Sequence, residues 1–384
     1  MANVRRVGIF CDPRHGNAIT HVLGLRSGFR DLGVDVSTGF MFLDGWRLAR
    51  FIDQFKPDFV IEINRSRNQV ADYGDDFPHI AWIQDCCPSG GKLIADGYGG
   101  SIINYSTMDP RAAGLNPDSG RWECLHAGID PGLYHPLMLP AAWDLSMIGQ
   151  LWQPLTADDL HVLVASGGIE TTIGEIQAAF LKAGIGHNNF DLTVLDRFLI
   201  SFMGARNPEY RWDSAYYALL CLYAGRLARL DDRPRMLRAV LAATAKVAFF
   251  GTGSWQSYPD LGAHFAGEIY RASDENTVIN ASHLVFHSGN VLMHDRVLKA
   301  MAAGRATVFN RTPFDDGPYG IVRHFDPGED FVFLGQDDIG EVVRALLADE
   351  PRRRRMGERA RRRVLEAHSW RHRAQRILDD FSCR

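Results

Sequence analysis

The stretch RRVGIFCDPRHGNAITHVLGLRSGFRDLGVDV, residues 5–36, contains a complete strand–helix–strand unit. Val7–Phe10 is a short apolar run that ends in turn-forming residues, and an amphipathic helix pattern follows over residues 20–32. Gly33 ends this helix, because glycine readily adopts the left-handed conformation that follows a helix, and residues 34–40 have the pattern of a second strand. Two apolar strands joined by a helix predict a parallel α/β sheet.

The same alternation of helix and strand continues toward the C-terminus. A helix pattern over residues 46–55 ends before Pro57, and an apolar-rich run follows at residues 59–63. Further short apolar runs lie at 80–83, 101–103 and 122–125. Runs that are apolar throughout are typical of parallel strands covered on both faces by helices. The sequence therefore predicts a Rossmann-like lobe over residues 1–140.

A second series of strands starts at residues 143–149 and is interrupted by a stretch, 155–245, that we expect to be mostly helical. The alternation resumes with a strand at 247–250. The later elements expected are strands at 284–286 and 306–309, and helices at 295–303, 337–348, 350–367 and 370–381. These residues predict a second Rossmann-like lobe over residues 141–366 with a helical insert.

The composition is that of a globular protein with two domains. The chain has 384 residues, of which 46% are hydrophobic and 23% charged, and domains usually have about 100–200 residues. A net charge of −4 provides no basic field, so we expect no nucleic-acid partner. No apolar run reaches the roughly 18 residues of a membrane span, the N-terminus lacks a signal-peptide pattern, and the six cysteines lack metal-ligand spacing. We expect a cytoplasmic protein without a bound metal.

Two loops of the first lobe carry candidate catalytic residues. In an open parallel sheet, ligands bind where strands end and helices begin. His15 and Gly16 follow the first strand, where the imidazole can act as a base or hydrogen-bond donor and the glycine lets a ligand approach; an ordinary turn is the alternative. Asp85 lies just after the strand at 80–83 and is a candidate general base, with a helix N-cap as the alternative.

The second lobe carries the candidate donor-binding residues. Gly251 and Gly253 follow a strand and can hold phosphate through backbone N–H groups. The segment His287–Arg296 then places His287, Asn290, His294 and Arg296 before or at the start of a helix. The helix dipole disfavours an arginine there, so Arg296 indicates either a bound diphosphate, which pairs with a guanidinium, or a local ion pair.

Eight arginines lie between Arg352 and Arg363. Glutamates are interspersed among them, and Met356, Ala360 and Val364 keep an apolar stripe, which is typical of a solvated helix face. A weak contact with an anionic membrane surface is the alternative interpretation.

Five segments resemble GT-B glycosyltransferases, and more narrowly the spore-maturation (CgeB-like) group related to glycosyltransferase family 4. In chain order they are LHAGIDPGLYHP (125–136), DLSMIG (144–149), RVLKAMAAG (296–304), FDPGED (325–330), and HSW with Arg373 and Ala374 (368–374). The resemblance covers residues 125 to about 380. It implies two Rossmann-like lobes, an acceptor side at 1–140, a donor side at 141–366, and a C-terminal helix, 367–384, that crosses back to the first lobe.

The resemblance also implies a nucleoside-diphosphate-sugar donor, with Arg296 at the diphosphate and no metal or other cofactor. The chain departs from family 4 at the two glutamates that lie eight positions apart, because Val291 and Lys299 occupy those positions. The carboxylate expected at the donor ribose is therefore replaced, and Lys299 is a candidate phosphate ligand instead.

These observations predict a glycosyltransferase that acts on a hydroxyl-bearing acceptor such as a glycan, a lipid-linked glycan or a protein. Two alternatives stay open: a non-catalytic nucleotide- or carbohydrate-binding module of the same fold, and a sugar-nucleotide epimerase. A homodimer and a location at the inner face of the membrane also stay open.

Overall fold

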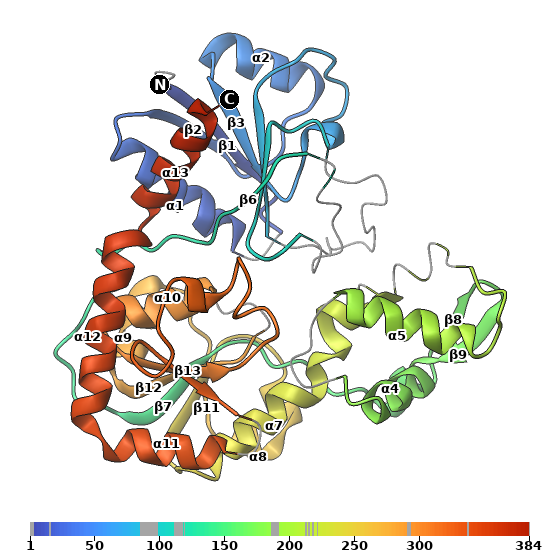
Figure 1. Ribbon diagram of the computed structural model, residues 1–384, viewed down its shortest axis with the longest axis vertical. Coiled ribbons are helices and arrows are strands. Elements are labelled where there is room, and N and C mark those ends of the chain that lie inside the picture. The colour runs from blue at the N-terminus through green and yellow to red at the C-terminus, as the bar shows by residue number, and fades with distance from the viewer. Residues whose placement is uncertain are drawn as a thin grey trace.

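The computed structural model describes residues 4–14, 17–84, 99–110, 118, 120–185, 192–211, 213, 216, 219–220, 222–289, 293–335 and 338–383. His15, Gly16, Asp85 and Asn290 lie outside the described residues. The described part forms two lobes, each built on its own parallel sheet, and a third body that extends sideways from the second lobe (Figure 1).

The first lobe contains a six-stranded sheet with the order β2-β1-β3-β4-β5-β6, and every adjacent pair of strands is parallel. Its elements are β1 (Arg6–Cys11), α1 (Ala18–Arg30), β2 (Asp35–Gly39), α2 (Gly45–Phe55), β3 (Phe59–Ile63), β4 (His79–Ile83), β5 (Ile103–Ser106) and β6 (Trp122–Cys124). The strand and helix order expected from residues 5–36 is therefore present. Strands β1 and β3 each have a neighbour on both sides in the sheet and are buried almost throughout, which explains their largely apolar runs.

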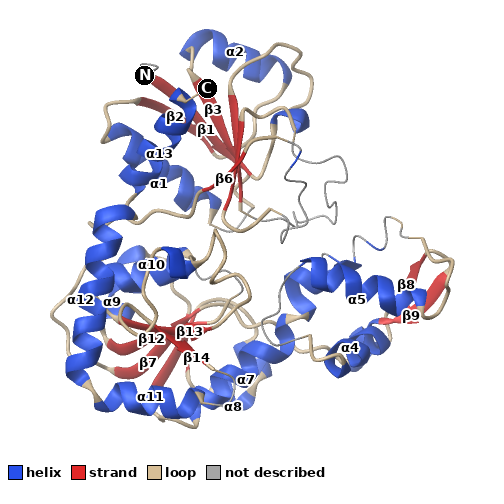
Figure 2. Ribbon diagram, in the orientation of Figure 1, coloured by secondary structure: helices blue, strands red, loops and turns tan. Residues whose placement is uncertain are grey.

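The second lobe repeats this plan with the strand order β11-β10-β7-β12-β13-β14, again all parallel. Its strands are β7 (Trp143–Ile148), β10 (Val247–Phe250), β11 (Phe265–Gly267), β12 (Ser282–His287), β13 (Ala306–Asn310) and β14 (Val332–Leu334). Its helices are α7 (Arg229–Leu241), α8 (Pro259–Gly262), α9 (Ala272–Asn280), α10 (Asp295–Ala302), α11 (Ile339–Ala348) and α12 (Glu350–Ala367). Figure 2 shows these helices around the sheet.

The insert between β7 and α7 has its own hydrophobic core and projects away from both sheets (Figure 1). It contains α3 (Ala157–Leu160), α4 (Ile173–Lys182) and α5 (Leu192–Gly204), but also an antiparallel hairpin of β8 (Leu163–Ser166) and β9 (Ile169–Thr172). The mostly helical expectation missed this hairpin. Its turn is Gly167-Gly168, and both residues have positive φ, as a two-residue hairpin turn requires.

The last helix, α13 (Trp370–Ser382), returns to the first lobe and packs against α1. The chain therefore passes between the lobes twice, and the two passages pair with each other. Ile129 and Ser369 form a parallel bridge, in which the Ile129 N–H donates to the His368 carbonyl and the Trp370 N–H to that of Ile129. Two of the sequence segments that resemble GT-B enzymes thus meet at one interlobe crossing.

Helix α1 accepts α13 only because it presents two glycines. A β-carbon at Gly28 would lie 2.2 Å from the Trp370 carbonyl oxygen, and one at Gly24 would lie 2.1 Å from the Trp370 ring. Backbone cannot move aside as a flexible side chain can, so the close approach requires glycine at position 28.

We therefore expect Gly28→Ala to lower the free energy of unfolding by about 1–3 kcal/mol, the usual cost of overpacking a core. Urea unfolding followed by circular dichroism measures this change. Gly204→Ala is the matched control, because a β-carbon at that helix position meets no atom of the described residues within 4 Å. Equal effects of the two substitutions would contradict the close packing of α13.

The arginine-rich helix α12 is only in part a solvated face. Arg353 is 8% exposed and donates to the carbonyl groups of Leu346 and Leu347, while Arg359 and Arg363 both pair with Asp326 and Asp330. The expectation was incomplete because spacing along one helix does not reveal partners from other elements.

In the described chain no helix combines the length and apolarity that a membrane crossing needs.

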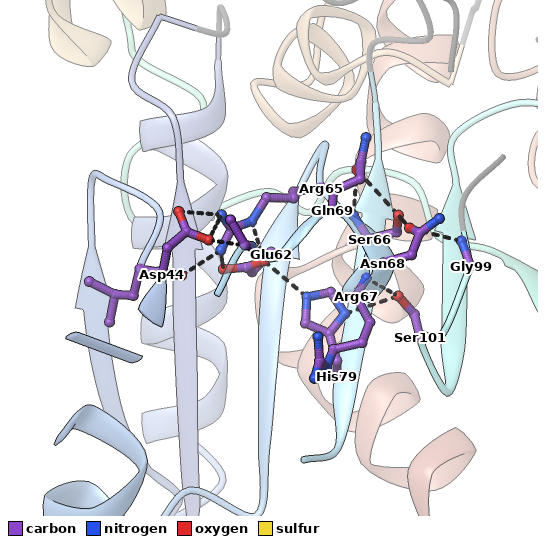
Figure 3. Close-up of polar contacts among 12 residues, drawn as sticks. Asp44, Glu62, Arg65, Ser66, Arg67, Asn68, Gln69, His79, Gly99 and Ser101 are labelled. Carbon is purple, nitrogen blue, oxygen red and sulfur yellow. Dashed lines mark hydrogen bonds and ion pairs between the residues drawn. The ribbon is translucent and has the colours of Figure 1, made fainter. Parts of the chain in front are cut away.

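A buried charged network holds the loops of the first lobe (Figure 3). Arg65 is bidentate on Glu62, with both contacts at 2.6 Å, and also contacts Asp44 at 3.0 Å. His79 joins Glu62 to Ser101, at 3.0 and 2.9 Å. Because these charges satisfy one another, we assign the network to fixing the segments after β2 and β3.

Candidate active site

The candidate site lies at the carboxyl ends of β7 and β12 and at the start of α10. Parallel strands end at the same edge of a sheet, so segments far apart in the sequence meet there. The segment after β7, residues 148–150, and the segment after β12, residues 287–289, are joined by a single side chain. The Arg233 guanidinium donates to the Gln150 and Ser288 carbonyl oxygens, the second at 2.7 Å.

Arg296 reaches the same edge from the first turn of α10. Its Nη1 donates to the Ile148 carbonyl oxygen at 3.0 Å. Gly149 leaves room for it, since a β-carbon at Gly149 would lie 3.0 Å from that nitrogen. Across the described residues no carboxylate lies within ion-pair distance of Arg296, so the local ion pair that the sequence left open does not form there.

Arg233, which the sequence reasoning did not select, is the most deeply buried cation of the site. It is 7% exposed, and neither of its side-chain contacts is to a carboxylate in the part of the chain that the structure describes. Burial, together with the positive charges of Arg229 and Arg296, lowers the pKa of Arg233 to about 9. A buried guanidinium among other cations calls for an anion, because an uncompensated buried charge is costly.

A sequence signal for Arg233 exists. It lies three, four and seven residues before Met236, Leu237 and Val240, which are all buried. Arg233 therefore occupies the apolar stripe of α7, where a charged residue is unusual.

His287 ends β12 and is buried with unused hydrogen-bonding capacity. It is 3% exposed, and neither ring nitrogen has a hydrogen-bond partner among the described residues. Burial, then His294 and the two arginines, hold the pKa of His287 well below its usual value, so the ring is neutral. Its ring centre lies 5.1 Å from that of His294. Buried polar groups normally have partners, so these nitrogens are available to a ligand.

The first turn of α10 carries a buried carboxylate network. Asp295 is 6% exposed, and its two oxygens lie 2.5 Å from His294 Nδ1 and 3.0 Å from Lys299 Nζ. Burial alone would raise the pKa of Asp295, but Lys299 and His294 hold it well below the usual range. Lys299 also pairs with Glu275 at 3.0 Å. Two carboxylates thus already hold the ammonium group that we considered for phosphate binding.

The two positions after β10 require glycine for the packing of the backbone, whether or not a ligand binds there. Gly251 and Gly253 have φ values of +113° and +114°, and β-carbons there would lie 2.2 Å from the carbonyl oxygens of Gly149 and Leu151. The Gly251 N–H already donates to the Gly267 carbonyl at 3.0 Å. These residues therefore allow two strand ends to approach closely, and their predicted contact with phosphate stays a prediction.

The first lobe reaches this site through the start of α1. The Asn17 amide donates to Asp295 Oδ2 at 3.3 Å, across the interlobe boundary. His21 lies one turn further along α1, 6% exposed, between the rings of Trp82 and Trp370 at 5.4 and 5.6 Å. Burial lowers the pKa of His21 to about 4, so it is neutral. Sequence reasoning pointed to the loop that contains Asn17 but selected neither residue for the site.

In the described part of the chain, no cluster of three or more His, Cys, Asp or Glu residues is arranged to hold a metal ion. The charged groups of the site are instead the guanidinium groups of Arg233 and Arg296 and the Asp295 network.

Comparison with known proteins matches residues 233–379 to a family described as glycosyl transferase-like. The α-maltose-1-phosphate synthase of Mycolicibacterium smegmatis is 25% identical over an alignment of 248 residues, and the match covers 59% of this chain and 57% of that protein. The chain thus spans a little over half the length of this curated relative.

Two solved structures are similar over nearly the whole chain. Sucrose-phosphate synthase from Thermosynechococcus elongatus has a TM-score of 0.57 at 10% identity, and the match covers 98% of both chains. The Anabaena protein HepE, in complex with UDP-glucose, has a TM-score of 0.52 at 11% identity, covering 98% of this chain and 100% of the other. The two-lobed α/β fold with a returning C-terminal helix, expected from the sequence, is confirmed. The chain has the GT-B fold, and residues 233–379, from α7 into α13, are similar to the glycosyl transferase-like family.

Proposed function

We propose that this protein transfers a glycosyl group from a nucleoside-diphosphate sugar, bound to the second lobe, to a hydroxyl group of an acceptor bound to the first. One observation carries this proposal. Arg233 and Arg296 both lie at the carboxyl ends of β7 and β12, and neither pairs with a carboxylate among the described residues. A diphosphate supplies the missing negative charge, and a guanidinium group matches its oxygens with paired donors.

In this proposal the arginines stabilise the leaving group. When the bond between the sugar and the diphosphate breaks, negative charge grows on the diphosphate oxygen, and fixed cations at that place lower the barrier. Two guanidinium groups provide the charge that a metal ion provides elsewhere, so we propose that transfer needs no divalent cation. Lys299 pairs with Asp295 and Glu275, and we assign it the role of holding Asp295 in place.

The likeness to HepE, which was solved with UDP-glucose, supports a nucleotide-sugar donor. We propose the narrower CgeB-like group on the sequence resemblance of five segments, two of which, 125–136 and 368–374, meet at the interlobe crossing. For the acceptor we propose a glycan, a lipid-linked glycan or a protein side chain, since all three carry hydroxyl groups.

Arg296→Ala is expected to lower kcat/KM for the donor at least tenfold, or about 1.4 kcal/mol of transition-state stabilisation. The assay measures nucleoside diphosphate release from UDP-, GDP-, ADP- and TDP-sugars, with EDTA present. Arg311→Ala is the control, because Arg311 pairs with Asp316 on the surface. Unchanged kinetics in the Arg296 variant would contradict the assignment of Arg296 to the phosphate site. Loss of all turnover in EDTA would contradict metal independence. Binding of a donor without turnover would favour a non-catalytic module.

A further inference from the structure

We propose that the linker between the lobes and the adjoining face of α12 form a surface that binds anionic lipid bilayers. The surface has two parts, which are the exposed apolar side chains of residues 133–142 and the arginines of α12 that lie beside them. This inference goes beyond the proposed transfer reaction and does not depend on it, because the residues concerned are not those of the candidate active site.

The linker exposes apolar side chains over a stretch that has no Asp, Glu, Lys or Arg. Its sequence at residues 133–142 is LYHPLMLPAA. Met138 is fully exposed, and Leu133 and Leu139 are 50% and 39% exposed. Single exposed apolar residues are common on protein surfaces, but here Met138, Leu139 and Pro140 follow one another and are all exposed. A contiguous apolar patch of this kind marks a contact with a membrane or with another protein.

The second lobe fixes the backbone of the linker, so that its apolar side chains face outward. The His135 carbonyl oxygen accepts from the Asn276 and Asn280 amides at 3.1 and 3.0 Å. The Leu137 N–H donates to the Asn280 side-chain oxygen at 2.8 Å. These backbone groups have partners inside the protein, so the neighbouring side chains can enter the interfacial region of a bilayer without taking unsatisfied polar groups with them.

Helix α12 runs beside the linker and supplies the positive charge (Figure 1). A β-carbon at Gly304 would lie 3.5 Å from Pro136 and 3.8 Å from Arg361, so the linker and α12 meet there. Arg305 Nη2 lies 3.5 Å from the Leu137 carbonyl oxygen. Guanidinium groups therefore flank the apolar stretch.

The part of α12 beside the linker has an excess of positive charge. Between residues 354 and 366, three of the six arginines pair with carboxylates. The other three, Arg355, Arg361 and Arg362, form no ion pair with any described residue, and Glu366 is the carboxylate on this stretch that is likewise without one. Three unpaired cations and one unpaired carboxylate leave two positive charges that anionic headgroups can neutralise. Each arginine near an anionic bilayer contributes about fivefold to the affinity.

This charge favours a bilayer over a second copy of the chain. In a two-fold dimer the same patch of both copies would meet, and the excess positive charges would then oppose each other. An anionic bilayer instead offers phosphate groups to the guanidinium groups and an apolar layer to the linker. Leu365, which is 37% exposed, adds an apolar side chain to the same helix.

The surface and the candidate active site lie at opposite ends of α10. Arg296 is in the first turn of this helix, and Gly304, against which the linker packs, follows its last turn. A helix of eight residues is about 12 Å long. Substitutions on the exposed side of the linker therefore leave the donor-binding residues unchanged.

Co-sedimentation of the full chain with vesicles tests the surface. One set of vesicles contains phosphatidylcholine alone, and the other contains two parts phosphatidylcholine to one part phosphatidylglycerol. We expect the protein to bind the mixed vesicles at least tenfold more tightly than phosphatidylcholine alone, because two excess charges each contribute about fivefold. Binding to the mixed vesicles should weaken as salt is added.

Two substitutions test the two parts of the surface, each with a matched control. Met138→Glu should lower the partition coefficient on mixed vesicles at least tenfold, because it replaces an apolar side chain with a charge that the headgroups repel. Leu163→Glu is its control, since Leu163 is 70% exposed on the insert. Arg362→Glu should lower binding to mixed vesicles at least tenfold and leave binding to phosphatidylcholine unchanged. Arg50→Glu, at an exposed position of α2, is its control.

Three results would overturn the proposal. They are a wild-type protein that does not bind the mixed vesicles, equal losses in Met138→Glu and Leu163→Glu, and equal losses in Arg362→Glu and Arg50→Glu. Sedimentation velocity tests the other occupant of the surface. A wild-type dimer that dissociates in Met138→Glu would assign the surface to a second copy of the chain instead.

Discussion

Arg233→Met is expected to weaken the binding of nucleoside diphosphates by about a thousandfold, or about 4 kcal/mol, because removing one partner of a buried charge pair costs roughly 2–5 kcal/mol. In the free protein this guanidinium is 7% exposed, and burial together with neighbouring cations lowers its pKa to about 9. A bound diphosphate would compensate that charge. Methionine has a similar length and no charge, so it keeps the packing of α7 and removes the anion's partner.

Calorimetric titration with UDP, GDP and ADP measures the effect. The control is Arg238→Met, which lies on the same helix but pairs with Asp260 near the surface, at 2.6 Å. Exposed pairs of this kind contribute little, so the control should bind like wild type. Equal affinity in the two variants would mean that Arg233 serves only to tie the segments after β7 and β12 together through their carbonyl groups.

Trp370→Ala is expected to lower the free energy of unfolding by about 3–5 kcal/mol, the usual loss for a large aromatic residue in a core. Trp370 is 7% exposed and its ring packs beside His21 and Trp82. It also occupies the space left by glycines on α1 and on the linker, since a β-carbon at Gly128 would lie 2.8 Å from it. Its removal leaves a cavity where α13 joins the first lobe.

Urea unfolding followed by circular dichroism measures this loss, with the exposed neighbour Arg371→Ala as the control. A loss below about 1 kcal/mol would show that α13 is held to the first lobe mainly by its other contacts, such as the Tyr105 hydroxyl donating to Asp380 at 2.8 Å. Comparing diphosphate affinity in the same variant tests whether the returning helix also affects the second lobe.

The elements with strong periodicity were predicted well. The strand at 247–250 and the helix at 350–367 have the bounds that the sequence indicated. Helix α9 and the short strands β11 and β14 were missed. Helix α9 has the sequence ASDENTVIN, and its buried face includes Asn276 and Asn280, whose amides donate to the His135 carbonyl group. Such a helix is stabilised by partners from another segment, which a periodicity argument does not contain.

The candidate site was predicted in part. Reasoning from strand ends selected Arg296, His287 and His294, which the structure brings to one edge of the second sheet. It assigned Lys299 to phosphate, where the structure instead pairs it with Asp295 and Glu275. It did not select Arg233, because the whole stretch 233–246 was interpreted as a basic amphipathic helix and the place of Arg233 in the apolar stripe of α7 was overlooked.

The sequence alone determined the order of most strands and helices, the two-lobed α/β class and the edge of the second sheet at which we propose that the donor binds, because these follow from local patterns of apolar residues, glycines and prolines. Only the tertiary structure decided which charges are paired. Arg233 is left among cations while Lys299 is neutralised, and Asn17 meets Asp295 from 278 positions away. The free energy of a charge depends on its burial and on neighbours that the fold brings together, and those are properties of the assembled sheets.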